Sequence, residues 1–149
     1  MKVLLLVPIR EKSFWIMPPL GLGYIATALL RRRHEVVILD SNVERLNMQS
    51  LINRINCINP DALGITMFST DVLVVNKISE MVKKNNQDIT IFVGGPHPSC
   101  SPYDVLNQLK WVDYAFQGEG EISVPAFIDY VSSKRNSTKR INEIPGLIY

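Results

Sequence analysis

The sequence contains few cysteines, little excess charge and no long apolar run, and each shortage excludes a class of protein. Two cysteines, Cys57 and Cys100, occur among 149 residues and lie far apart. That spacing excludes a zinc site made of clustered cysteines and any three-cysteine iron–sulfur motif within the chain. We therefore expect a reduced, cytoplasmic protein, with Cys57 as a small core residue and Cys100 more exposed.

The charge and the apolar runs also limit the partners. A formal net charge of +2 is too small to favour nucleic acid, and the sequence carries no RNA- or DNA-binding motif. The apolar run at residues 3–7 is short and ends at Pro8, so we interpret it as a first strand and not as a signal peptide. No apolar run approaches the roughly 20 residues of a membrane-spanning helix. We expect neither nucleic acid nor a membrane as a partner.

The pattern of apolar residues indicates the fold class. Hydrophobic residues make up 46% of the chain and charged residues 20%, which is typical of a globular domain. Apolar runs alternate with segments of helical periodicity, which predicts a doubly wound α/β fold in a single domain, residues 1–149. We expect a flavodoxin-like, five-stranded parallel sheet in the order 2-1-3-4-5, with helices on both faces. The expected strands are 3–7, 35–39, 62–66, 89–93 and 114–116, and the expected helices are 21–32, 48–58, 74–85, 103–109 and 123–132.

Two glycine-containing loops follow the fourth and fifth expected strands. Gly-Gly-Pro-His at residues 94–97 ends one apolar run, and Gln-Gly-Glu-Gly-Glu at residues 117–121 ends the other. Glycine lets the backbone adopt conformations that side chains would obstruct. Ligands of an open α/β sheet bind beyond the carboxyl ends of its strands. We therefore interpret the two loops as walls of one site.

Two kinds of domain share this strand order, but the sequence lacks the residues that each of them requires. A phosphate-receiver domain requires an acidic pair after the first strand, an aspartate at the end of the third and a lysine after the fifth. The sequence has Pro8-Ile9, Thr66 and Gln117 at these places. FMN binding requires a hydroxyl-rich phosphate loop directly after the first strand, and residues 8–13 contain one late serine.

A dinucleotide site remains an alternative. Gly21, Gly23 and Ala26 fit the G-x-G-x-x-A pattern, and Asp40 ends the second strand. The mechanism of that pattern requires its glycines directly after the first strand, whereas here a long connection intervenes. The other interpretation is that small residues let this helix pack close to the sheet. A nucleotide-dependent (NAD- or FAD-type) enzyme fragment using Gly21, Gly23 and Asp40 is the alternative function.

The sequence shows no recognisable pair of nucleophile and base. His34 precedes the second strand, and we expect it to be a surface turn residue. His97 lies between two prolines, where structural and functional roles both remain open. Glu119 and Glu121 could act as acids or bases, or they could stabilise the N-terminus of the following helix.

Taken together, five segments resemble one known family over nearly the whole chain. The sequence resembles the cobalamin-binding domain found N-terminal to the radical SAM core in B12-dependent radical SAM proteins. The matching segments occur in the expected order and on the expected elements. They are Pro18–Ala26, His34–Val36 with Asp40, Pro60–Thr66, Val93–His97 and Gly118–Glu121.

The resemblance implies a corrinoid held against the carboxyl ends of the strands, with its nucleotide tail in a cleft between loops. Ser69 and Thr70, which could otherwise cap the third helix, would supply hydroxyl groups. Gly94 and Gly95 would supply bare backbone for a bulky tail, and residues 118–121 would close the far wall. The implied cofactor-binding residues are Thr66, Phe68, Ser69, Thr70, Gly94, Gly95, Pro96, His97, Gln117, Gly118, Glu119 and Gly120.

Two family features are absent from this sequence. The D-x-H-x-x-G motif of methionine-synthase-like B12 domains supplies a histidine to cobalt, but residues 8–13 contain no histidine. The resemblance therefore implies base-off binding without a histidine ligand, with Arg10, Phe14 and Trp15 as candidates near the lower face. The three-cysteine motif of the radical SAM core is also absent, so S-adenosylmethionine and a [4Fe–4S] cluster would belong to a core outside this chain.

The function expected from the resemblance is that of a binding module. The chain would bind cobalamin without catalysing a reaction, either as part of a longer methyltransferase that continues beyond Tyr149 or as a stand-alone corrinoid carrier. A degenerate domain of this fold that acts only as a docking surface is the third possibility.

Overall fold

The computed structural model describes residues 1–10, 17–133 and 141–149 and contains one sheet of six strands. The strand order is β2-β1-β3-β4-β5-β6, with β1 to β5 parallel and β6 antiparallel to β5. The central strands β1 and β3 consist mostly of buried apolar residues, as expected for a parallel sheet that is covered on both faces. The strands are β1 Lys2–Val7, β2 Glu35–Asp40, β3 Ala62–Thr66, β4 Thr90–Gly94, β5 Tyr114–Phe116 and β6 Leu147–Ile148.

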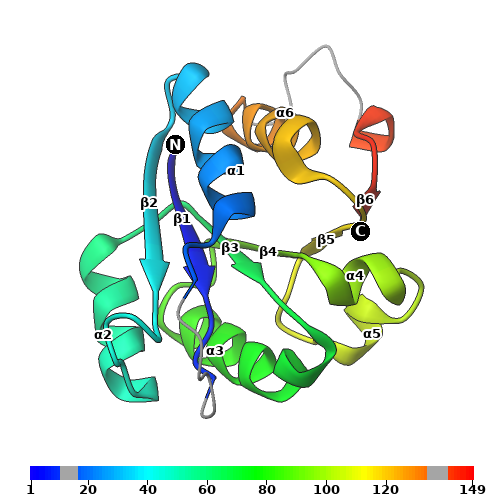
Figure 1. Ribbon diagram of the computed structural model, residues 1–149. Helices are drawn as coiled ribbons and strands as arrows, with labels where there is room; N and C mark the ends of the chain where they lie inside the picture. Colours follow the sequence, from blue (N-terminus) through cyan, green and yellow to red (C-terminus); the bar gives the residue numbers. More distant parts are fainter. Residues whose placement is uncertain (11–16, 134–140) are drawn as a thin grey trace.

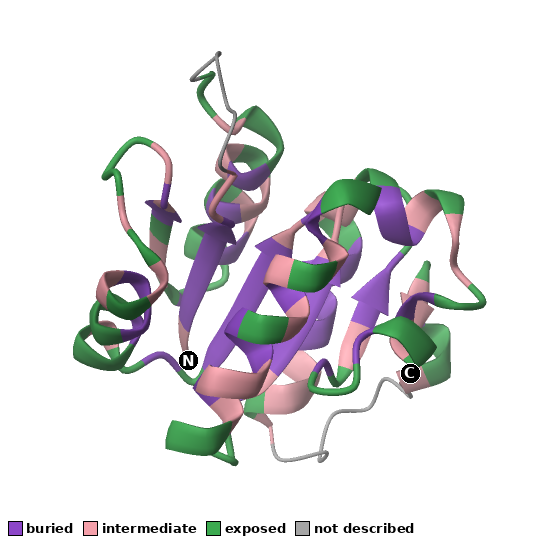
Figure 2. Cartoon of the chain, turned by 90° about the horizontal axis from the view of Figure 1, so that it is seen from below, coloured by how far each residue is buried: buried purple, intermediate pink, exposed green. Residues whose placement is uncertain are grey.

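Helices cover both faces of the sheet in two layers (Figure 1). Helices α1 and α6 pack on one face, and α2, α3 and α5 pack on the other. The strands are buried between the layers, while the outer sides of the helices are exposed (Figure 2). The helices are α1 Leu20–Arg31, α2 Met48–Ile58, α3 Val72–Asn85, α4 Pro96–Cys100, α5 Val105–Gln108 and α6 Gly120–Ser132. In the described ranges, no helix is long and apolar enough to cross a membrane.

The predicted order of the first five strands is confirmed, but the prediction of a five-stranded sheet is wrong. After a 3₁₀ turn at Ile141–Glu143, the chain returns beside β5 and adds β6. Gly146 allows this return because its φ is +68° and a side chain there would overlap the carbonyl of Gln117. The Gln117 N–H donates to the Gly146 carbonyl at 2.8 Å. Two residues are too few to show the alternation that identifies a strand in a sequence.

Four local expectations also differ from the structure. The segment after β4, expected as a loop, forms the short helix α4, and α6 begins at Gly120 instead of residue 123. Cys57 is exposed, because Leu51, Ile52 and Ile55 are the residues of α2 that face the sheet. His34 is buried, because α6 covers it.

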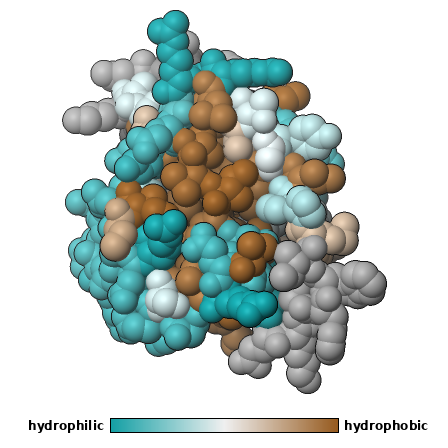
Figure 3. Space-filling model, turned by 60° about the vertical axis from the view of Figure 1, so that its left-hand side comes forward, coloured by the Kyte–Doolittle hydropathy of each residue, from teal (hydrophilic) through white to brown (hydrophobic). Residues whose placement is uncertain are grey.

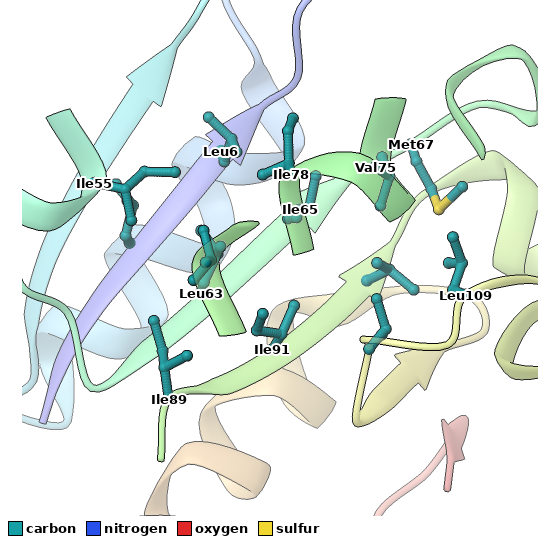
Figure 4. Close-up of a cluster of buried hydrophobic side chains, with 14 of the residues drawn as sticks. Leu6, Ile55, Leu63, Ile65, Met67, Val75, Ile78, Ile89, Ile91 and Leu109 are labelled. Carbon is teal, nitrogen blue, oxygen red and sulfur yellow. The ribbon is translucent and has the colours of Figure 1, made fainter. Parts of the chain in front are cut away.

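The two faces of the sheet are filled differently. On the α2 and α3 side, aliphatic side chains interdigitate between the strands and the helices (Figure 4). On the α1 and α6 side, the core is aromatic: the Phe92 and Phe116 rings have centroids 5.7 Å apart and meet at 83°. Phe127 of α6 packs edge-on against both, with centroid distances of 5.8 and 5.5 Å. This edge-to-face geometry is the preferred one for aromatic pairs and fixes the position of each ring.

The outer side of α1 and the edge strand β2 carry exposed apolar residues. Figure 3 shows apolar side chains gathered on the face of the molecule that carries these two elements. Leu30 and Ile38 are among the exposed residues there. Leu22, Ala26 and Leu29 are buried on the other side of α1. Helix α1 is therefore apolar on two sides, only one of which faces the sheet.

A small polar network ties the far end of α1 to α6. His34 Nε2 lies 2.9 Å from Asp129 Oδ1, and Arg32 donates to Asp129 Oδ2 at 2.5 Å. Burial raises the pKa of Asp129, but the hydrogen bonds from His34 and Arg32 outweigh burial, and the net pKa is lowered. The ionised carboxylate therefore stabilises the folded state. This stabilisation is present above the pKa of the unfolded chain and is lost as the pH falls through the lower pKa of the folded chain.

Replacement of Asp129 by asparagine tests this network. We expect Asp129→Asn to lower the free energy of unfolding at pH 7 by about 1 kcal/mol, a value that allows for the partial exposure of Asp129. The difference from the parent should shrink below about pH 4, where the parent carboxylate becomes protonated. Urea unfolding followed by circular dichroism between pH 3 and pH 7 measures it. Asp88→Asn, in an exposed turn, is the control. A destabilisation that stays constant down to pH 3 would contradict the proposed role of the charge.

Candidate functional site

A cavity of about 490 Å³ lies between the sheet and the helices α1 and α6, at the carboxyl ends of the strands. Its floor is formed by side chains of the strands, and its sides are formed by the two helices. Its rim is formed by the loops after β3, β4 and β5. The floor and sides include Leu5, Phe92, Phe116, Leu22, Ile25 and Val124, and the rim includes Thr66, Gly94, Gly95, Pro96, Ser99, Gly118, Glu119, Gly120 and Glu121.

Two glycines determine the shape of this cavity. A Cβ atom on Gly64 of β3 would overlap the ring of Phe92 on the neighbouring strand, so glycine allows that ring to lie across β3. A Cβ atom on Gly120 would stand 2.8 Å from Ile25 Cδ1, so glycine allows the start of α6 to approach α1. Any larger residue at either place would displace a wall of the cavity.

The rim after β4 is a turn that requires glycine and is held by hydrogen bonds. Gly95 has a φ of +103°, and a Cβ atom there would stand 3.0 Å from both the Met67 carbonyl oxygen and Thr66 Oγ1. The Ser99 hydroxyl donates to the Gly95 carbonyl and accepts from the Gly118 N–H, each at 3.0 Å. Ser99 therefore joins the loop after β4 to the loop after β5 and fixes the width of the opening.

Glycine backbone is uncovered at two points of the rim. A Cβ atom on Gly94 or on Gly118 would meet nothing within 4 Å. Gly118 has a φ of +79°, which favours glycine, whereas Gly94 ends β4 and its φ is not positive. Bare backbone beside a cavity lets a large ligand approach closely.

An ion pair anchors the loop after β1 to the loop after β3. Arg10 donates to Asp71 through Nε at 3.1 Å and Nη2 at 2.7 Å. Asp71 is 3% exposed and also accepts from the Phe68 N–H at 2.9 Å. The Arg10 guanidinium lies 4.7 Å from the centroid of the Phe68 ring, a cation–π contact. The Arg10 N–H donates to Asn42 Oδ1 at 2.9 Å, which joins the start of this loop to the turn after β2.

His97 is buried, and both of its ring nitrogens have partners. Nε2 donates to Gln108 Oε1 at 3.1 Å, so Nδ1 accepts from the Ser69 hydroxyl at 3.0 Å. Its side chain joins α4 to α5 and to the loop after β3. His97 is 6% exposed and is not among the residues that line the cavity.

The structure brings part of the predicted site together around the cavity. The predicted residues that line it are Thr66, Gly94, Gly95, Pro96, Gly118, Glu119 and Gly120. The predicted residues that lie on the same loops without lining it are Phe68, Ser69, Thr70, His97 and Gln117. Phe14 and Trp15, predicted near the lower face of a corrinoid, lie outside the described residues.

Sequence reasoning missed the floor and the sides of the cavity. Leu5, Phe92 and Phe116 are indistinguishable in the sequence from ordinary residues of buried strands. Gly64 offered the one signal, because a glycine inside an apolar strand indicates that another group approaches closely.

The glycines of the alternative dinucleotide pattern lie inside helix α1. Gly21 and Gly23 belong to its first turns and not to a tight turn after β1. Asp40 accepts from the N–H groups of Asn42 and Val43, so its carboxylate stabilises the turn after β2. Gly21 lines the cavity, but a Cβ atom there would meet nothing within 4 Å.

A family model and several relatives match this chain over most of its length. The model of the family described as the B12 binding domain matches residues 7–128. An uncharacterized methyltransferase of Pyrococcus horikoshii is 29% identical over 154 aligned residues, which include 100% of this chain and 32% of the relative. An anaerobic magnesium-protoporphyrin IX monomethyl ester cyclase of Rubrivivax gelatinosus is 26% identical, with 89% of this chain and 24% of the relative covered. The chain thus spans a third or less of these curated relatives.

A solved structure shares the fold. The radical S-adenosylmethionine methyltransferase TsrM from Kitasatospora setae, with cobalamin and a [4Fe–4S] cluster bound, superposes with a TM-score of 0.82 at 23% identity. The match covers 98% of this chain and 28% of TsrM.

The ion pair between Arg10 and Asp71 can be tested by a double-mutant cycle. Arg10→Met, Asp71→Asn and the double variant should give a coupling energy of about 1–3 kcal/mol, because Asp71 is almost fully buried. Urea unfolding of the four proteins measures it. The same cycle at Lys77 and Glu80, an exposed pair on α3, is the control and should give a much smaller coupling. Equal coupling in both cycles would show that the buried pair does not hold the two loops together.

Proposed function

We propose that this chain, which belongs to the B12-binding domain family, holds a cobalamin at the carboxyl edge of its sheet, with the nucleotide tail in the cavity between α1 and α6. The observation that carries the proposal is the cavity itself. Its volume of about 490 Å³ lies within the usual range of roughly 300–1,000 Å³ for small-molecule sites. Its apolar floor suits an aromatic base, and its glycine rim suits a bulky ligand.

The residues of the cleft have distinct roles in this proposal. Leu22, Phe92 and Phe116 would contact the base of the tail. The hydroxyls of Thr66 and Ser99 lie at the rim, where the polar ribose and phosphate of a nucleotide would remain. Ser69, expected from sequence to donate a hydroxyl to the ligand, instead donates to His97. Gly94 and Gly118 would leave space for the remainder of the cofactor.

Cobalamin would be bound base-off and without a histidine ligand. A tail base in the cavity cannot coordinate the cobalt of the same molecule. The sequence contains two histidines, and both have other partners: His34 contacts Asp129, and His97 contacts Ser69 and Gln108. Arg10 lies on the loop after β1, but a guanidinium has no lone pair to offer a metal. The described residues near this edge therefore supply no strong nitrogen ligand.

The same edge of the sheet carries exposed apolar side chains. Leu20 at the start of α1, Phe68 after β3, Leu73 at the start of α3 and Ile122 at the start of α6 are all about half exposed or more. A large macrocycle, or a second domain facing it, would cover such residues. This arrangement supports a corrinoid whose reactive face points away from the sheet.

In a longer protein, this module would serve a radical SAM core that carries S-adenosylmethionine and a [4Fe–4S] cluster. The relatives are about three times as long as the chain or longer, and by name two are methyltransferases and one is a methylase. When bound, cobalamin would supply a cobalt centre that accepts and donates a methyl group. The chain's own residues would bind and orient the cofactor, and the module alone would not catalyse the transfer.

Binding of hydroxocobalamin by the purified protein tests the proposal. We expect one corrinoid per chain to co-elute on gel filtration. After reduction to cob(II)alamin, the electron paramagnetic resonance spectrum should lack nitrogen superhyperfine splitting. Gly94→Val should weaken binding at least tenfold, because its side chain would enter the ligand's space from a position where an added Cβ atom meets no protein atom within 4 Å. Gly23→Ala, a glycine of α1 that does not line the cavity, is the matched control.

Three outcomes would contradict the proposal. Failure of the parent protein to bind hydroxocobalamin would favour a docking domain without cofactor. Binding of NADH in its place would favour the dinucleotide alternative. Unchanged corrinoid binding by the Gly94→Val variant would place the cofactor elsewhere on the protein.

A further inference from the structure

The walls of the cavity are apolar below the rim. Apart from Thr66 at the end of β3 and Glu121 at the start of α6, the side chains that the strands and the two helices contribute to the lining are aliphatic or aromatic, and they include Leu5, Leu22, Ile25, Phe92, Phe116 and Val124. In the described part of the chain, the buried side-chain oxygens without a partner belong to Ser41, Asn76 and Ser79, which do not line the cavity.

The backbone of the floor is equally closed to hydrogen bonding. Leu5 pairs with Ile38 on one side and with Gly64 on the other, and Gly64 pairs with Phe92. The N–H and C=O groups of these central strands are therefore used in the parallel ladders of the sheet. The lining residues with polar side chains come from the ends of elements: Thr66 ends β3, Ser99 belongs to α4, and the glutamates at positions 119 and 121 flank the start of α6.

The floor is also held in shape. Phe92 and Phe116 pack edge-to-face, and Phe127 supports both from behind while remaining fully buried. The Phe92 ring also lies directly against Gly64, so a shift of the ring would disturb this contact. A ligand must therefore adapt to this floor, and a polar group that enters it will not find a partner by a small side-chain movement.

We propose that this cavity selects corrinoids by the base of their tail, accepting a benzimidazole and rejecting a purine. The inference rests on the proposed binding of the tail in the cavity. A dimethylbenzimidazole presents methyl groups and carbon edges to the floor. An adenine of similar size adds two ring nitrogens and an exocyclic amine, which lose their water without gaining a partner. Each buried polar group left unpaired weakens binding substantially, which gives an apolar pocket its power to discriminate.

The test compares three corrinoids that differ only in the tail. Hydroxocobalamin carries dimethylbenzimidazole, adeninylcobamide carries adenine, and cobinamide carries no base. Dissociation constants are measured by titration calorimetry, with gel filtration as a check. We expect adeninylcobamide to bind about ten to a hundred times more weakly than hydroxocobalamin, and cobinamide also to bind more weakly.

The outcomes separate this inference from the proposed function. Adeninylcobamide binding within about twofold of hydroxocobalamin would overturn the selectivity while leaving corrinoid binding intact. Cobinamide binding as tightly as hydroxocobalamin would show that the tail does not use the cavity, which also overturns the inference. If none of the three binds, the proposed function fails and the inference fails with it.

A pair of variants on α1 tests the physical cause. Leu22→Gln places an amide donor and acceptor on the side of the cavity, where both can pair with the edge of an adenine. The ratio of the two dissociation constants should fall at least fivefold, through weaker binding of hydroxocobalamin and stronger binding of adeninylcobamide. Leu30→Gln makes the same exchange on the exposed side of α1 and should leave the ratio unchanged. The ratio is measured within one folded protein, so a loss of stability does not imitate it. An unchanged ratio in Leu22→Gln would show that floor polarity does not set the selectivity.

Discussion

A parallel sheet must be covered on both faces, and protein interiors normally leave few voids larger than a water molecule. Here the α2 and α3 side follows this constraint, because a cluster of buried, mostly aliphatic residues packs between the strands and the helices (Figure 4). The α1 and α6 side does not: a cavity of about 490 Å³ remains at the carboxyl edge. Apolar walls without partner atoms lose dispersion contacts, so a cavity of this kind weakens the fold. A ligand that fills it would restore those contacts, and the free energy gained there would contribute to binding.

The loops at the carboxyl edge of the sheet are joined to one another by side-chain hydrogen bonds. Ser99 joins the loops after β4 and β5, Asp71 joins the loops after β1 and β3, and His97 holds α4 against α5. Several polar residues at the carboxyl edge are thus used in holding the loops and not in contacting the cavity. A site fixed in this way loses little conformational freedom on binding, which favours affinity. The same division of roles is seen within the Gly-Gly-Pro-His segment. His97 is buried and holds the loops, whereas Gly94, the first glycine of the segment, faces open space.

The sequence allowed the rim of the site to be predicted but not its floor. Gly94, Gly95 and Gly118 stand out because glycine in a loop after a buried strand usually marks a special backbone conformation or a close approach. The order of the five parallel strands follows from the alternation of elements. Phe92 and Phe116 carry no such signal, since a cavity is a property of how side chains meet across strands. The sixth strand was missed because a two-residue strand depends on its partner, β5, for recognition. His34 was misplaced for the same reason: its burial depends on α6, which is distant in the sequence.

The apolar floor affects two properties of the site: which tail base binds there, and whether that base can coordinate the cobalt. A floor without hydrogen-bonding groups favours the base with fewer polar groups, and a base held there is withdrawn from any metal in the same ligand. The chain's two histidines are engaged elsewhere, and Arg10 is fixed by Asp71 beside the ring of Phe68. The tail would therefore provide affinity at a distance from the reactive centre, while the described residues at this edge offer no strong ligand. Under the proposed function, the reactivity of the cofactor would then depend on what faces it from the other side, which is consistent with a module that binds and a separate domain that catalyses.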